Sequence, residues 1–108
     1  GLIKMKIDLG LAFAQLKQKK NWLDYSVDYG NYVRYTCYLA STDWISYKLS
    51  DIASKCIVSG STSELAEARS KYATELQKRE AYRQGLSDIR EKLKKIPELV
   101  ELFAQEEA

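Results

Sequence analysis

Five glutamates between residues 64 and 91 are the side chains of this sequence most suited to chemistry. Clustered carboxylates could act in acid–base catalysis or bind a metal ion. Basic residues alternate with them at the i, i+4 distance of a helix, as Glu67 does with Lys71. Glu75 and Arg79 have the same spacing. This pattern is typical of a solvated helix face, so we interpret the glutamates as surface charge.

Other groups that commonly carry catalysis or bind metals are scarce. The sequence has no histidine, which excludes Ser-His-Asp triads, Cys-His pairs and His-ligated zinc. Cys37 and Cys56 are nineteen positions apart and form no CxxC motif. We interpret them as two small core residues in a reducing compartment, with a disulfide as the alternative. No SxxK motif or glycine-rich phosphate loop occurs, so we predict no catalytic residue, no cofactor, no metal and no enzyme activity.

The length and composition indicate one small, folding domain. The chain has 108 residues, of which 45% are apolar and 30% are charged, and its net charge is +2. These values favour a packed core over disorder. The longest apolar stretch near the start, residues 9–14, is far shorter than the roughly 20 residues of a membrane span. We therefore expect a single domain over residues 1–108 and no membrane partner.

The positive charge is concentrated at the start of the chain. Residues 1–20 contain five lysines and one acidic residue. Three lysines within residues 17–20 precede Trp22, and cations beside aromatic rings could contact phosphates and stack on bases. A small nucleic-acid-associated or regulatory protein is therefore an alternative function. Nucleic acid is not the favoured partner, because this segment is short and the domain is barely basic.

The first 40 residues form an N-terminal segment, and their hydrophobic pattern predicts only part of its structure. Asp8 can cap a helix over residues 9–20, and residues 2–7 are expected to be extended or frayed. Within residues 22–40, alternating tyrosines around a Gly-Asn pair favour a β-hairpin. A helix that starts near Asn31 fits the same segment. Its apolar face would be made of Tyr32, Tyr35 and Leu39.

The second part of the chain predicts a mainly α fold built on a helical hairpin. One helix is expected over 43–58, a second over 63–95, and Gly60 is expected to end the first in a left-handed conformation. The apolar stripe of the first helix comprises Ile45, Leu49, Ile52 and Cys56. The stripe of the second includes Leu86, Ile89, Leu93 and Ile96. Its coiled-coil spacing predicts a hairpin core or a self-association seam. Pro97 precedes a short amphipathic tail helix over 97–108.

Two short motifs lie within residues 38–95. The first reads Leu39-Ala40-Ser41-Thr42-Asp43-Trp44, and the second reads Tyr82-Arg83-Gln84-Gly85-Leu86-Ser87-Asp88-Ile89. Together they resemble the LxxTDW and YRQxLxDI pattern of small tail proteins of tailed bacteriophages, notably tail-fibre assembly proteins. The resemblance implies a helical hairpin and a non-enzymatic role as a structural part, an adaptor or an assembly chaperone. It also implies a location in the virion, or in the host cytoplasm during assembly.

An antiparallel hairpin would bring the two motifs together. Trp44 would be a large anchor at the start of one helix, and Arg83 of the other helix could reach Asp43. The face opposite Trp44 would be made of Tyr82, Leu86 and Ile89. The tyrosine-rich segment, which includes Tyr32 and Tyr35, and the acidic tail helix would face partners. Those partners would be other virion or tail proteins, or further copies of the chain.

Overall fold

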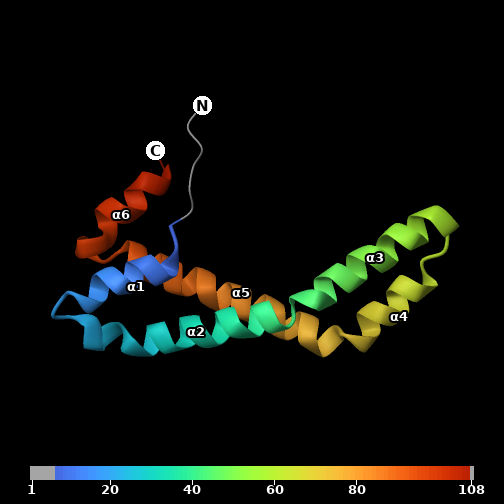
Figure 1. Ribbon diagram of the computed structural model, residues 1–108, viewed down its shortest axis with the longest axis horizontal. Helices are drawn as coiled ribbons and strands as arrows, with labels where there is room; N and C mark the ends of the chain where they lie inside the picture. Colours follow the sequence, from blue (N-terminus) through green and yellow to red (C-terminus); the bar gives the residue numbers. More distant parts are fainter. Residues whose placement is uncertain (1–6, 108) are drawn as a thin grey trace. The chain divides into compact units, whose positions relative to one another are not determined.

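The computed structural model describes residues 7–107, and every regular element in that range is a helix (Figure 1). The prediction of a mainly α fold is confirmed. The elements are α1 (Leu9–Lys17), a short 3-10 helix η1 (Trp22–Tyr25), α2 (Ser26–Ser41), α3 (Asp43–Ser59), α4 (Ser63–Lys71), α5 (Ala73–Lys94) and α6 (Pro97–Glu107). None of these helices is both long enough and apolar enough to span a membrane. The extended segment predicted over 2–7 lies outside the described residues, apart from Ile7.

The described residues form two compact units. The first unit contains residues 7–34 and 85–107, and the second contains Tyr35–Gln84. Helices α2 and α5 each contribute residues to both units.

The first unit has its core where α1 packs against α6. Phe13 is fully buried, and its ring lies 5.5 Å from the Tyr29 ring and 5.6 Å from the Tyr32 ring, measured between centroids. Residues of α5 and α6 complete this core. They are Ile89 and Leu93 of α5 and Leu99 and Phe103 of α6, together with Ile96 from the connection between the two helices. The tail helix therefore buries its apolar face inside the chain, so the prediction that this helix faces partners is wrong for Leu99 and Phe103.

Two ion pairs hold the first unit together across its helices. Arg90 and Glu106 are 3.0 Å apart with only 12% and 13% of their side chains exposed. Both also bind the backbone of Ile7, whose carbonyl accepts a hydrogen bond from Arg90 and whose N–H donates to Glu106. Lys92 lies 2.7 Å from Asp28. The hydrogen bond that the Lys92 amino group donates to the Asp28 carboxylate raises the pKa of Lys92 above its usual value.

Local signals in the sequence give several helix ends correctly. The Asp8 side chain accepts a hydrogen bond from the Gly10 N–H and so caps α1. Gly60 ends α3 with φ of 77°, a left-handed conformation that suits glycine. Pro97 is the first residue of α6, where a missing N–H costs no hydrogen bond.

Of the two interpretations of residues 22–40, the β-hairpin is wrong and the helix is confirmed, although the helix begins at Ser26 and not near Asn31. This segment forms η1 and α2, and Gly30 and Asn31 lie inside α2. Tyrosine has only a modest preference for strands, and tertiary packing overrides it. The helix places Tyr29 and Tyr32 on one side, where both rings contact Phe13.

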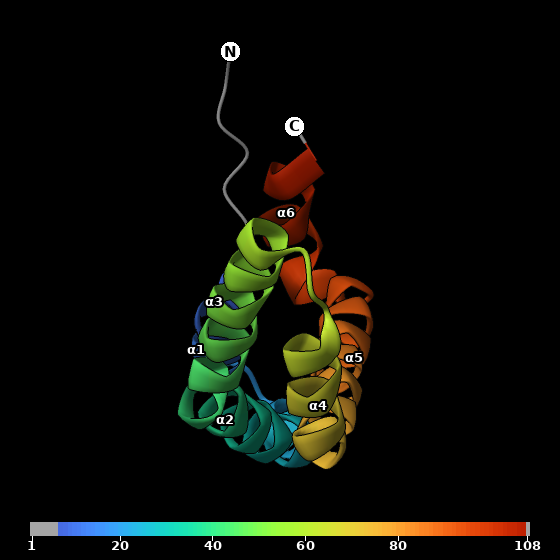
Figure 2. The ribbon, with the colours of Figure 1, turned by 90° about the vertical axis from the view of Figure 1, so that its right-hand side faces the viewer.

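The single helix predicted over 63–95 is also corrected. Helix α4 ends at Lys71, and α5 begins at Ala73. Tyr72 leaves helical geometry between them, with φ of −101° and ψ of 15°, while its N–H still donates to the Ala68 carbonyl. The hairpin partner of α3 is therefore the nine-residue α4 alone, and the two helices lie side by side (Figures 1 and 2).

Candidate functional site

The second unit holds the helical hairpin α3–α4 and most of the residues singled out by the two sequence motifs. Ile45, Ile52 and Cys56 of the predicted stripe are buried, and Leu49 is half-buried, so the stripe of α3 is confirmed. Leu86, Ile89 and Leu93 belong to the first unit. The prediction that they form the core of this hairpin is therefore wrong.

Arg79 holds the start of the hairpin in place. Its guanidinium is 3% exposed and donates to the Leu39 carbonyl at 2.7 Å, to the Thr42 hydroxyl and to the Asp43 carboxylate at 3.2 Å. These three acceptors lie at the end of α2 and the beginning of α3. A guanidinium suits this position because its donors are arranged as a rigid fork. The first motif therefore has a structural role, since it supplies all three acceptors.

Arg79 was expected on a solvated helix face, and Arg83 was expected to reach Asp43. Both predictions are wrong. Arg83 lies one helical turn further along α5, is 52% exposed, and pairs with Glu80 at 3.6 Å. Helical spacing identifies the face of α5 that carries arginines, but it does not determine which turn lies beside Asp43.

The aromatic residues of the two motifs do not contact one another as predicted. Trp44 packs edge-on against Tyr72, with ring centroids 5.6 Å apart, and it remains 52% exposed. Tyr82 instead stacks on Tyr35 at 4.8 Å and meets the edge of Tyr38 at 4.6 Å. These contacts make the tyrosines half-buried parts of the fold.

An apolar hollow opens at the closed end of the hairpin, where α3 turns into α4. It has a volume of about 410 Å³. The residues that line it are Ala53, Cys56, Ile57, Gly60, Thr62 and Leu65. Ile57 and the adjacent Val58 are 83% and 90% exposed. We call this region the tip hollow. Large aliphatic side chains exposed beside an apolar cavity are typical of a protein-binding surface.

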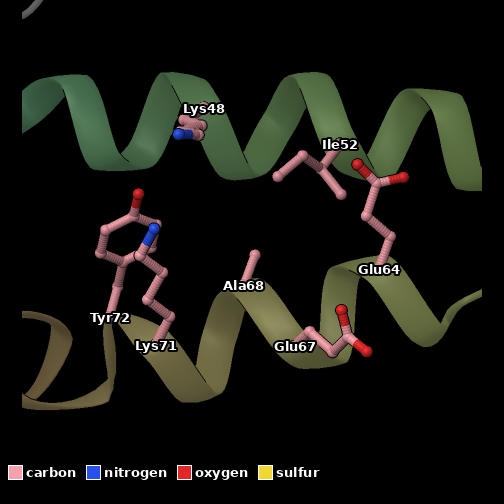
Figure 3. Close-up of a pocket in the computed structure, with 7 residues that line it drawn as sticks. All are labelled: Lys48, Ile52, Glu64, Glu67, Ala68, Lys71 and Tyr72. Carbon is pink, nitrogen blue, oxygen red and sulfur yellow. The ribbon is translucent and has the colours of Figure 1, made fainter.

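A second depression, which we call the charged groove, lies between α3 and α4 (Figure 3). Its volume is about 220 Å³. Ile52 and Ala68 form its apolar middle. Lys48 and Lys71 lie at one end, with their amino groups 5.8 and 5.5 Å from the Tyr72 ring centroid. Glu64 and Glu67 lie toward the other end.

The tip hollow and the charged groove share no lining residue. Lys48 and Ile52 of α3 line the charged groove, whereas Ala53, Cys56 and Ile57 of the same helix line the tip hollow. Substitutions can therefore be chosen that fall in one depression and not in the other.

The cysteine and acidic side chains of the described residues form neither a metal-binding cluster nor a disulfide. Within residues 7–107, no group of three or more cysteine or acidic side chains is placed to hold a metal ion. Both cysteines are free thiols. Cys56 is buried as predicted, but Cys37 is exposed, so its assignment to the core is wrong. In the first unit, burial and the neighbouring Asp8 carboxylate raise the pKa of Tyr32.

The basic segment that suggested nucleic-acid binding makes contacts inside the first unit. The Lys17 amino group lies 5.3 Å from the centroid of the Trp22 ring and 4.9 Å from that of the Tyr29 ring. Lys17 is therefore already engaged by the aromatic rings that could stack on bases. Lys19 and Lys20 are exposed.

Comparison of the chain with protein-family models, with curated proteins and with solved structures finds no match. The resemblance to phage tail proteins thus rests on the two motifs alone. Sequence reasoning missed Arg79 as a buried residue and the Ile57–Val58 pair as an exposed one. A signal for that pair was present, since both residues lie outside the regular stripe of α3.

Proposed function

We propose that this chain is a non-enzymatic protein of bacteriophage tails, acting as an adaptor or an assembly chaperone through its helical hairpin. The observation that carries the proposal is the tip hollow. Ile57 and Val58 are two of the most exposed large apolar residues of the described chain, and they lie beside an apolar cavity. Leaving such a surface in water favours aggregation unless another protein covers it.

The two motifs support the phage assignment from an independent direction. Thr42 and Asp43 of the first motif fix the start of the hairpin through Arg79. Trp44 packs on Tyr72, the residue at the end of α4. A firmly held hairpin presents its tip as a rigid binding element, which lowers the entropic cost of association. The proposed place of action is the virion, or the host cytoplasm while tails are assembled.

Disrupting the tip hollow tests this function. In a phage whose copy of the gene is deleted, we expect particles without complete tails and a large loss of plaque-forming titre. Wild-type protein supplied from a plasmid should restore both. The double substitution Ile57→Asp and Val58→Asp should not restore them, because two carboxylates in an apolar interface must be desolvated without partners. Electron microscopy of lysates and plaque counts provide the readout.

A matched control uses exposed apolar residues outside the hairpin. Leu23 and Val27 are 80% and 73% exposed in the first unit. The double substitution Leu23→Asp and Val27→Asp should restore tails as well as the wild type does. Normal tails in the deleted phage would contradict the proposed function. Equal failure of both variants would contradict the assignment of binding to the tip.

A further inference from the structure

We propose that the charged groove binds a second copy of this chain, so that two hairpins pair around a two-fold axis. This inference concerns a different surface from the tip hollow and does not depend on a role in phage tails. It rests on the order of charges along the groove, on the absence of ion pairs between these charges and other residues within 7–107, and on the apolar middle between them.

The basic side chains of the groove lie on one side of its apolar middle, and the acidic side chains lie on the other. On α3, Lys48 lies four residues before Ile52, and on α4, Glu64 lies four residues before Ala68. Four residues of an α-helix span about 6 Å along its axis. Because α3 and α4 are antiparallel, Lys48 lies toward the Tyr72 end of the groove and Glu64 lies toward the other end.

A two-fold axis through the middle of the groove exchanges its two ends. The surface of one copy then meets the same surface of the other in the reverse direction, as in isologous dimers. Lys48 and Lys71 of each copy would face Glu64 and Glu67 of the other. A parallel pairing would instead place lysines against lysines. The charge order therefore selects a second copy in the antiparallel sense.

The charges of the groove are available for such pairing. In the part of the chain that the structure describes, Glu64 and Glu67 take part in no ion pair, whereas several other acidic residues do. Lys48 and Lys71 likewise form no ion pair with the described residues, and their amino groups lie over the Tyr72 ring. All four charged side chains are exposed. Ala68 has a small side chain and Ile52 is largely buried, so neither side chain keeps the apolar middles of two grooves apart.

The size of the surface predicts a weak and reversible dimer. A specific interface usually buries about 800 Å² on each partner. Helix α4 has nine residues, so it is only about 14 Å long. Exposed ion pairs are screened by salt, with a Debye length of about 30 Å at 0.01 M and about 8 Å at 0.15 M. We therefore expect the dimer to form at high protein concentration and to dissociate as salt is added.

Charge reversal at either end of the groove tests the proposal. One variant carries Lys48→Glu and Lys71→Glu, and the other carries Glu64→Lys and Glu67→Lys. Light scattering of the full chain across a concentration series at low salt should give a concentration-dependent dimer for the wild type. Each variant alone should stay monomeric, because both ends of its groove then have the same sign. An equimolar mixture should regain the dimer, since an acidic groove then meets a basic one.

The control exchanges an ion pair outside the groove. Glu80 and Arg83 form an exposed pair on α5, and the variant Glu80→Arg with Arg83→Glu should dimerise like the wild type. Circular dichroism should show unchanged helicity for every variant. A wild type that stays monomeric at all concentrations, a dimer unaffected by salt, or a mixture no larger than its components would overturn the proposal. Because the Ile57→Asp and Val58→Asp variant should still dimerise, this test and that of the tip hollow can fail separately.

Discussion

Replacing Phe13 with alanine is expected to lower the free energy of unfolding by about 3–5 kcal/mol. Phe13 is fully buried, and its ring contacts Trp22, Tyr29 and Tyr32. Alanine would remove the ring and leave a cavity that these aromatic side chains fill only in part. Small domains are stable by only about 5–15 kcal/mol, so this change removes a large share of the total. Urea unfolding followed by circular dichroism measures the loss.

Leu11 is the matched control for this substitution. It lies on the same helix, but 46% of it is exposed. Leu11→Ala should cost less than about 1 kcal/mol, because much of the removed surface is already in water. Similar losses for Phe13→Ala and Leu11→Ala would contradict the packing of the first unit around Phe13.

Replacing Arg79 with alanine is expected to lower the free energy of unfolding by about 1.5–3 kcal/mol, the range of a hydrogen bond to a charged group. The Leu39 carbonyl and the Thr42 hydroxyl would lose a buried donor, while Asp43, whose side chain is 50% exposed, would be solvated. Arg79→Lys should recover only part of the loss, because an ammonium lacks the planar fork that reaches several acceptors. Hydrogen exchange should become faster for the amides at the junction of α2 and α3.

Arg83 provides the comparison, since the sequence alone predicted that it would carry out this task. Its pair with Glu80 is exposed, and such pairs contribute about 0–1 kcal/mol. Arg83→Ala should therefore leave the stability and the exchange rates nearly unchanged. If Arg83→Ala proved as costly as Arg79→Ala, the assignment of the junction to Arg79 would be incorrect.

Features that depend on neighbouring residues in the sequence could be predicted. The cap at Asp8, the left-handed Gly60, the helix start at Pro97 and the stripe of α3 each follow from local hydrogen bonding or from helical periodicity. The corresponding backbone conformations are favourable over a few residues. No distant contact is needed to select them.

Features that depend on distant contacts could not be predicted. The break at Tyr72 accompanies its packing against Trp44, 28 positions earlier. Arg79 is buried where it meets its hydrogen-bond acceptors, which lie 36 to 40 positions earlier in the sequence. Tyr29 and Tyr32 are part of a helix that packs on Phe13, although their intrinsic preference is for strands. In each case the energy of tertiary packing outweighs the local conformational preference on which the prediction from the sequence relied.

The candidate site was only partly visible for the same reason. The hairpin itself was expected, but the tip hollow forms only when α3 and α4 pack and leave Ile57 outside the core. The charged groove likewise forms only when α3 packs against α4, because this packing brings Lys48 beside Tyr72 at the end of α4. Charges spaced along one helix look like ordinary surface until a second helix places their counterparts beside them.

Site-specific photo-crosslinking during phage growth can show directly whether the tip hollow contacts a tail protein. A photoreactive phenylalanine analogue is placed at Ile57 in the tip hollow, or at Leu23 in the first unit as the control. If the tip hollow binds a tail component, covalent adducts to that component should form from position 57, identified by mass spectrometry, and none should form from position 23. The absence of a tail-component adduct from position 57, or equal adducts from both positions, would contradict binding at the tip hollow.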